Sequence, residues 1–120
     1  MIEPITNLPN NVLGFSARGT VTEADYKTVI IPAVEEKFSK YPKVRFLYHL
    51  GEDFSKFETT ALWEDAKIGL KHMASWDRIA VVTDIDWIRT AVQIFSFLLH
   101  GPVRVFPNAE IATARHWISE

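Results

Sequence analysis

The chain has 120 residues, a size at which one domain buries roughly two thirds of its unfolded surface without disulfides or metals. It contains no cysteine, which excludes disulfides and thiolate metal sites. The formal charge is −2, with 13 basic residues spread among 15 acidic ones. Because the basic residues form no concentrated positive patch that would attract phosphates, we expect no nucleic-acid partner. The first residues, MIEPITNL, lack the basic and apolar regions of an export signal or anchor. We therefore expect a single cytoplasmic domain over residues 1–120.

The chain opens with a predicted β-hairpin. Residues 12–17 (VLGFSA) alternate partially between apolar and small or polar side chains, which is typical of a strand. The turn-forming residues 9–11 (PNN) connect them to residues 2–8. This arrangement predicts an antiparallel pair of strands at the N-terminus.

A helix is expected to follow the hairpin. Thr22 and, three residues later, Asp25 have the spacing of a capping box, and apolar residues keep helical spacing as far as Pro42. Pro32 lies inside this helix. Because proline has no amide hydrogen and its ring crowds the preceding turn, we expect a kink or break near Ile31.

The remaining chain alternates between strands and helices. Strands are expected at 44–50 and 79–83, and the second has so few polar residues that it suits a strand covered on both faces. The other expected elements are a helix from about 58 to 74, a helix at 86–100, a strand at 102–106 and a helix at 108–118. The order β-β-α-β-α-β-α-β-α predicts an α/β domain with four helices and a mainly parallel sheet, to which the N-terminal hairpin adds an antiparallel strand.

Several local strings occur in a characteristic order. They are G-T-V-T-E-A-D-Y (19–26), A-L-W-E-D (61–65), R-I-A-V-V-T-D-I-D-W (78–87), V-R-V-F (103–106) and a terminal A-x-x-W-I (114–118). With these strings the chain resembles the SpoIIAA-like proteins, small bacterial proteins whose fold is similar to the STAS domain of anti-sigma-factor antagonists and, more remotely, to the CRAL-TRIO lipid-binding domain. The resemblance covers nearly the whole chain and implies a STAS-like fold. It does not specify a function, because one fold hosts many functions.

The resemblance also implies a regulatory position. In the STAS antagonists a D-S-[ST]-G motif opens the helix after the third strand, and its serine is phosphorylated to control a partner. Here E-T-T-A (58–61) occupies that place, so Thr59 and Thr60 are the candidate phospho-switch, and a phosphate there would be favoured by the helix dipole. The alternative, which we favour, is that Thr59, Thr60 or Ser55 caps the helix; Ser55 and Glu58 have capping-box spacing.

The histidines and carboxylates between residues 49 and 72 lack metal-binding spacing. Asp65 and His72 share a helix face, but seven positions separate them by roughly 10 Å. We therefore expect no metal and no cofactor. The charged residues of this helix point away from an apolar stripe that we expect to be buried. The stripe consists of Leu62, Trp63, Ala66, Leu70, Met73 and Ala74.

Two polar residues at predicted strand ends are the candidates for catalysis. His49 and Asp84 follow neighbouring strands at the carboxyl edge of the sheet, where ligands tend to bind, so together they would serve as acid and base. The alternative is a structural histidine held by a backbone carbonyl. The chain has no nucleophile elbow and no phosphate-binding glycine motif, so we expect a protein that is not an enzyme.

The 86–100 segment has more apolar surface than one sheet can cover. At about 100° per residue its polar side chains occupy roughly 60° and its apolar ones about 220°, whereas packing on a sheet needs about 100°. It is too short to span a bilayer, so we expect no membrane insertion. The surplus surface is then covered by a neighbouring helix, by a second subunit or by an apolar ligand.

We assign the centre of this arc to the sheet and its shoulders to an interface or apolar-ligand surface. The residues expected to face the sheet are Trp87, Ala91, Ile94 and Leu98, and the candidate surface residues are Ile88, Val92, Phe95, Phe97 and Leu99. A charge at Val92 or Leu99 should therefore give a folded monomer, and a charge at Leu98 should unfold the chain.

The sequence thus predicts a non-catalytic bacterial STAS-like module with a regulatory or protein-interaction role, present as a homodimer. The alternative is an intracellular carrier or sensor of a small apolar ligand such as a fatty acid, suggested by the CRAL-TRIO likeness and the aromatic content. An enclosed apolar cavity of about 300 Å³ or more would favour the carrier. An enzyme is the third possibility.

Overall fold

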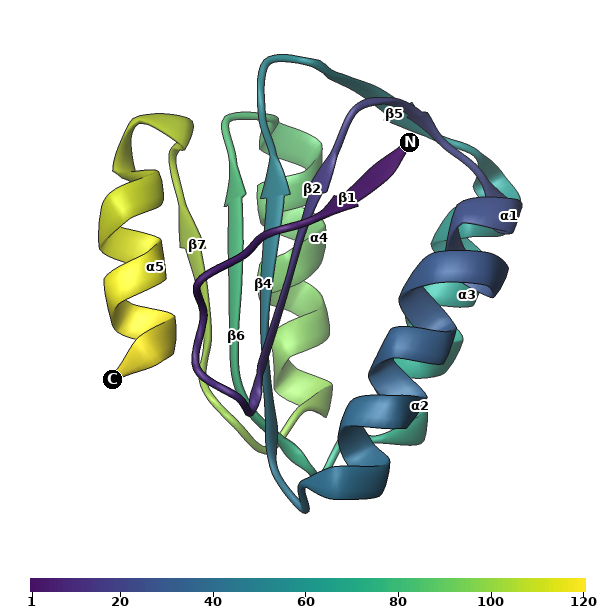
Figure 1. Ribbon diagram of the computed structural model, residues 1–120. Helices are drawn as coiled ribbons and strands as arrows, with labels where there is room; N and C mark the ends of the chain where they lie inside the picture. Colours follow the sequence, from purple (N-terminus) through teal and green to yellow (C-terminus); the bar gives the residue numbers. More distant parts are fainter.

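The computed structural model describes residues 1–120 and contains a central five-stranded sheet with helices on both faces (Figure 1). Its strand order is β1-β2-β4-β6-β7. The antiparallel pairing of β1 with β2 and the parallel pairing of all other neighbours confirm the predicted sheet. The strands are β1 (Ile2–Pro4), β2 (Val12–Ala17), β4 (Val44–Leu50), β6 (Trp76–Thr83) and β7 (Val103–Phe106).

A second sheet of two short parallel strands was not predicted. It pairs β3 (Gly19–Val21) with β5 (Phe54–Phe57). Gly19 has φ +58°, a left-handed conformation that glycine adopts without steric cost. Strands of this length are too short for a periodic pattern, which is why the sequence did not indicate them.

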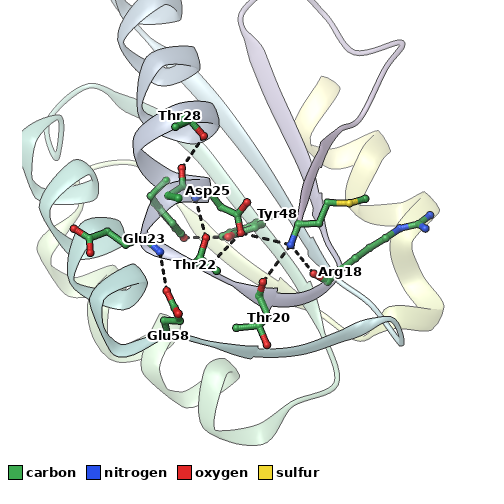
Figure 2. A network of polar contacts seen from close by, with 11 residues as sticks. Arg18, Thr20, Thr22, Glu23, Asp25, Thr28, Tyr48 and Glu58 are labelled. Carbon is green, nitrogen blue, oxygen red and sulfur yellow. Dashed lines mark hydrogen bonds and ion pairs between the residues drawn. The ribbon is translucent and has the colours of Figure 1, made fainter.

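The first helix forms as the sequence predicts. It runs continuously through α1 (Glu23–Asp25), the π-helical η1 (Tyr26–Ile30) and α2 (Ile31–Lys40). The capping box is present: the Thr22 hydroxyl accepts from the Asp25 amide at 3.1 Å, and the Asp25 carboxylate accepts from the Thr22 amide at 2.9 Å (Figure 2). These two bonds satisfy amides that the first helical turn leaves unpaired.

Pro32 does not break this helix. The Ile31 amide donates to the carbonyl of Tyr26, five residues back, so a π-helical turn precedes the proline. The helix then continues as α2, with Pro32 in its first turn, where a missing amide hydrogen is tolerated. The expected disruption near Ile31 therefore takes the form of a wider turn.

The helices form two unequal layers (Figure 1). The first helix, α3 (Thr59–Lys71) and α4 (Asp86–Phe95) lie on one face of the sheet, and α5 (Ile111–Ser119) lies on the other. Short 3₁₀ turns, η2 (Ser96–Leu98) and η3 (Asn108–Glu110), follow α4 and precede α5. These segments correspond to the four predicted helices, and none of them could span a bilayer.

Strand alternation divides the core between these two faces. Phe46, Tyr48 and Leu50 of β4 belong to the larger core, which the first helix, α3 and α4 cover. Leu47 of β4 belongs to the smaller core, which α5 covers through residues such as Ile118.

α4 is rotated about its axis relative to the prediction. The row that faces the sheet is Ile88, Val92, Phe95 and Leu99, whereas Trp87, Ala91, Ile94, Phe97 and Leu98 are exposed. The cause lies at the start of the helix, where the Arg89 guanidinium donates to the Thr83 carbonyl at 3.0 Å. This bond draws the polar stripe to the end of β6 and turns the adjacent row onto the sheet, about 90° from the expected orientation. The expectation that Trp87, Ala91, Ile94 and Leu98 face the sheet is therefore wrong. Val92 and Leu99, where a charge was expected to leave the fold intact, pack against the core instead.

α3 also presents the opposite face to the one predicted. Its buried residues are Ala61, Glu64 and Ile68, while the expected core residues Leu62, Trp63, Leu70, Met73 and Ala74 are exposed. α3 packs mainly on α1 and η1 rather than on the sheet, so contact with another helix determines its buried face. Ala61 is fully buried there, and its small side chain permits the close approach. The apolar stripe is left facing α4 and solvent.

We predict that a charge on the sheet-facing row of α4 destabilises the fold strongly, whereas a charge on the exposed row has little effect. Ile88 is 4% exposed, so Ile88→Glu should lower the free energy of unfolding by about 3 kcal/mol or more, because it buries an unpaired carboxylate. Ile94 is 65% exposed, so the matched variant Ile94→Glu should change it by about 0.5 kcal/mol or less. Urea denaturation of both variants tests this. Equal destabilisation would contradict the observed orientation of α4.

Candidate functional site

An apolar pocket lies between α3, α4 and the sheet. Its volume is about 250 Å³, and 19 of its 21 lining residues are hydrophobic; the other two are Asp65 and Gly69. Leu62, Ala91 and Trp87 line the pocket and are also exposed, so it opens to solvent between α3 and α4. A predominantly apolar lining with a few polar groups is typical of pockets that hold small molecules.

Aromatic side chains from the sheet form the inner wall. The ring of Phe46 makes edge contacts with Trp76 at 5.8 Å and with Tyr48 at 5.5 Å between centroids. The Trp76 indole donates to the carbonyl of Gly69 at 3.1 Å, which ties this wall to α3. A Cβ on Gly69 would lie 3.2 Å from the ring of Phe95, so the glycine allows α4 to approach α3 closely.

Three polar groups meet at one side of the pocket. The hydroxyl of Tyr26 (η1) donates to Oδ1 of Asp65 (α3) at 2.7 Å and lies 3.0 Å from the hydroxyl of Tyr48 (β4). Both tyrosines are buried. Sequence reasoning considered Asp65 only as a metal ligand and did not identify this cluster. The available signal was the position of Tyr48 in the strand, where it alternates onto the same face as the apolar Phe46 and Leu50.

Burial dominates the acid–base properties of the cluster. It raises the pKa of the Asp65 carboxyl, although the hydrogen bond from Tyr26 acts in the opposite direction. Burial also raises the phenol pKa of Tyr26 and of Tyr48, and the nearby Asp65 carboxylate raises both further. Both tyrosines therefore remain protonated at physiological pH. Many protein atoms surround the Asp65 carboxylate, yet the residue is exposed because it forms part of the wall of an open pocket, so water also reaches it.

Most residues predicted for the α4 surface line this pocket. Ile88, Val92, Phe95 and Leu99 all contribute to its wall. Phe97 does not, and at 90% exposure it is the most exposed large apolar side chain of the chain. The structure thus brings four of the five candidates together around a cavity and places the fifth on the outer surface.

His49 and Asp84 lie at neighbouring strand ends but do not form a pair. Oδ1 of Asp84 accepts from the amide of Asn108 at 2.8 Å, at the start of η3. His49 alternates with Tyr48 along β4 and so points to the α5 face, away from the pocket, where burial lowers its pKa. The acid–base arrangement considered from the sequence is not formed.

Neither threonine nor serine caps α3. Its N-cap is Glu58, which makes no capping bond with its side chain, and Ser55 lies within β5. Glu58 instead accepts from the amide of Glu23 at 3.1 Å and thereby connects α3 to α1 (Figure 2). The capping interpretation is therefore wrong. Thr59 and Thr60 are exposed in the first turn of α3, and the phospho-switch stays a prediction.

His72 has a structural environment. Its Nε2 lies 2.7 Å from Oε1 of Glu35, and its ring stacks on Phe38 with centroids 4.0 Å apart. The hydrogen bond to His72 is the main cause of the lowered pKa of Glu35. These contacts join α2 to the end of α3, and no three His, Asp or Glu residues gather in a way that could hold a metal ion.

We predict that Asp65→Asn changes how stability depends on pH. Because burial raises the pKa of Asp65, the native state binds its proton more tightly than the unfolded chain, and this contribution to stability is lost as pH rises above about 4. Asparagine still accepts from Tyr26 but carries no charge. The stability of Asp65→Asn relative to the parent should therefore increase with pH.

Urea denaturation between about pH 4 and pH 8 measures this difference. Asp53→Asn is the control, because Asp53 is exposed and its side chain makes no hydrogen bond; its effect should stay within about 0.5 kcal/mol at every pH. A relative stability of Asp65→Asn that falls as pH rises would show instead that the ionised Asp65 carboxylate stabilises the fold.

Comparisons with known proteins agree with this architecture. The family model of the SpoIIAA-like proteins matches residues 12–119. The crystal structure of an uncharacterised DUF3478-family protein from Shewanella loihica PV-4, which has a SpoIIAA-like fold, superposes with a TM-score of 0.76. The match covers 98% of this chain and 92% of that chain at 23% identity, so it shows the fold alone. No curated protein matches. The predicted STAS-like α/β fold is confirmed, and the chain belongs to the SpoIIAA-like family.

Proposed function

We propose that the protein is a non-catalytic bacterial STAS-like module of the cytoplasm that binds a small apolar ligand between α3 and α4. The observation that carries this proposal is the pocket of about 250 Å³ with 19 hydrophobic residues among the 21 that line it. The pocket is open and is smaller than the enclosed cavity of about 300 Å³ or more expected for a carrier, but it is larger than a cavity that holds benzene, about 150 Å³. A short-chain or single-ring molecule fits this range.

The surroundings of the pocket support a binding role. Trp63 on α3 and Trp87 on α4 are 66% and 53% exposed, and other large apolar side chains of both helices are exposed with them. Soluble proteins rarely leave a large contiguous apolar surface uncovered unless a ligand or partner occupies it. A ligand that enters between the helices would cover the parts of this surface nearest the mouth.

The chemistry of the pocket favours binding over catalysis. Its polar groups are two phenols and one carboxylate, and the structure pairs no nucleophile with a base there. His49 points to the other face of the sheet, and Asp84 is engaged by Asn108. The pocket therefore supports a carrier or sensor.

We predict that the protein binds octanol and that filling the pocket abolishes binding. Ala66 is half-buried on the α3 wall, so Ala66→Phe would place a ring inside the cavity. Ala112→Phe is the matched control, because Ala112 is exposed on α5, on the opposite face of the sheet. Trp76 and Trp87 line the pocket, so their fluorescence reports occupancy.

Saturable fluorescence changes in the parent and Ala112→Phe, and at least about tenfold weaker binding in Ala66→Phe, are the expected result. Absence of saturable binding in the parent, or equal binding by all three proteins, would contradict the proposed function.

Self-association is a second candidate function, favoured by the outer row of α4. Ile94, Phe97 and Leu98 are all more than half exposed, and aromatic and aliphatic residues of this kind form the cores of obligate interfaces. Thr59 and Thr60 lie within one turn of Leu62 and Trp63 on α3, so a phosphate there would add charge beside the same surface. This arrangement would give a regulatory interaction module.

We predict that, if the chain dimerises through this row, Phe97→Glu weakens the dimer by about tenfold or more, because it places an unpaired charge in an apolar interface. Thr113→Glu on the exposed side of α5 should leave association unchanged. Sedimentation equilibrium of the parent and both variants measures the dissociation constants. A parent chain that stays monomeric at its highest soluble concentration would remove the homodimer from consideration.

A further inference from the structure

The polar cluster beside the pocket has a fixed number of protons. Each tyrosine has one hydroxyl proton. Tyr26 donates its proton to Oδ1 of Asp65 at 2.7 Å, so in its 3.0 Å contact with Tyr48 it must be the acceptor. Tyr48 therefore donates its only proton to Tyr26. With an ionised Asp65, every proton of the cluster is used within the cluster.

The pocket consequently faces acceptors only. Tyr48 and Asp65 belong to the lining of the pocket, whereas Tyr26 does not. Two acceptors of the cluster receive no hydrogen bond. One is a lone pair on the Tyr48 hydroxyl oxygen, and the other is Oδ2 of Asp65, because the single hydrogen bond to this carboxylate goes to Oδ1. The indole N–H of Trp76 donates to the carbonyl of Gly69, and Trp87, the other tryptophan of the lining, is more than half exposed and lies outside the inner wall. The inner wall offers a ligand no free donor.

We propose that the pocket selects small apolar molecules that carry a hydrogen-bond donor, a hydroxyl or an ammonium group, and rejects carboxylates. The inference rests on the proposed function. A ligand donor would satisfy Oδ2 of Asp65, and hydrogen bonds to charged acceptors in apolar surroundings are the stronger ones. An ammonium would also lie among the rings of Phe46, Tyr48 and Trp76, which favour cations.

A carboxylate ligand would meet the opposite situation. Its charge would enter an apolar cavity, find no donor on the inner wall and face Asp65 with the same sign. This argues against the fatty acid that the sequence suggested as an example of a ligand. Selection follows from the direction of two hydrogen bonds rather than from the shape of the cavity.

Four ligands of similar size test the proposal at about pH 8, where carboxylates are ionised. Octanol and its isomer heptyl methyl ether differ in the O–H donor, while octylamine and octanoate carry opposite charges. Octanol and octylamine should bind at least about tenfold more tightly than the ether, and octanoate should bind most weakly. Titration calorimetry gives the four dissociation constants.

Two variants connect the selection to the cluster. In Asp65→Asn the amide oxygen still accepts from Tyr26 and the amide nitrogen supplies a donor, so the ether and octanoate should gain affinity relative to octanol. A variant that merely loosened the pocket would weaken all four ligands alike. Tyr48→Phe removes the other acceptor and should reduce the preference for octanol even if Asp65→Asn does not fold. Asp53→Asn, at an exposed site, should bind like the parent.

The outcomes separate the two proposals. Equal affinity for octanol and the ether, or tightest binding of octanoate, would overturn the proposed selection while leaving an apolar binding pocket in place. Failure of all four ligands to bind would overturn the proposed function and the selection together. A donor preference that persists unchanged in both Asp65→Asn and Tyr48→Phe would also overturn the selection, because another group would then be its source.

Discussion

The hydrogen bond between Tyr26 and Asp65 is the interaction on which the arrangement of the helices depends. It joins the first helix to α3 across 39 positions of sequence, at a distance of 2.7 Å. The Asp65 carboxylate lies on the wall of an apolar pocket, where a hydrogen bond from a donor such as a phenol to a charged acceptor is stronger than in water. The bond holds the side of α3 that carries Asp65 against η1, next to the buried residues Ala61 and Ile68. The apolar stripe of α3 is left beside the space that becomes the pocket.

The orientation of α4, which completes the pocket, also depends on a polar contact. Arg89 binds the carbonyl of Thr83 at the end of β6 and directs one apolar row of α4 toward the sheet. That row forms one wall of the pocket, α3 forms the second, and the aromatic residues of β4 and β6 form the floor. Gly69 lets Phe95 approach α3 closely, so the helices meet at this point. Two polar contacts at the edges thus position an apolar cavity between them.

Patterns contained within short segments predicted the elements well. The hairpin, the parallel strands, the four helices and the Thr22–Asp25 capping box all follow from local periodicity and turn chemistry. The rotations of α3 and α4 were predicted wrongly, because periodicity gives the width of an apolar stripe and not the element that covers it. α3 rests on another helix, and its orientation depends on a tyrosine far away in the sequence. The same long-range contact explains why Asp65 was considered only as a metal ligand.

The most direct test of a ligand-binding role is native mass spectrometry of the protein purified from its own host under non-denaturing conditions. We expect one small molecule for each chain, with a hydroxyl or amino group on an apolar body, and its absence from the Ala66→Phe variant purified in the same way. A parent protein whose mass equals that of the bare polypeptide, whether as a monomer or a dimer, would contradict a ligand-binding role.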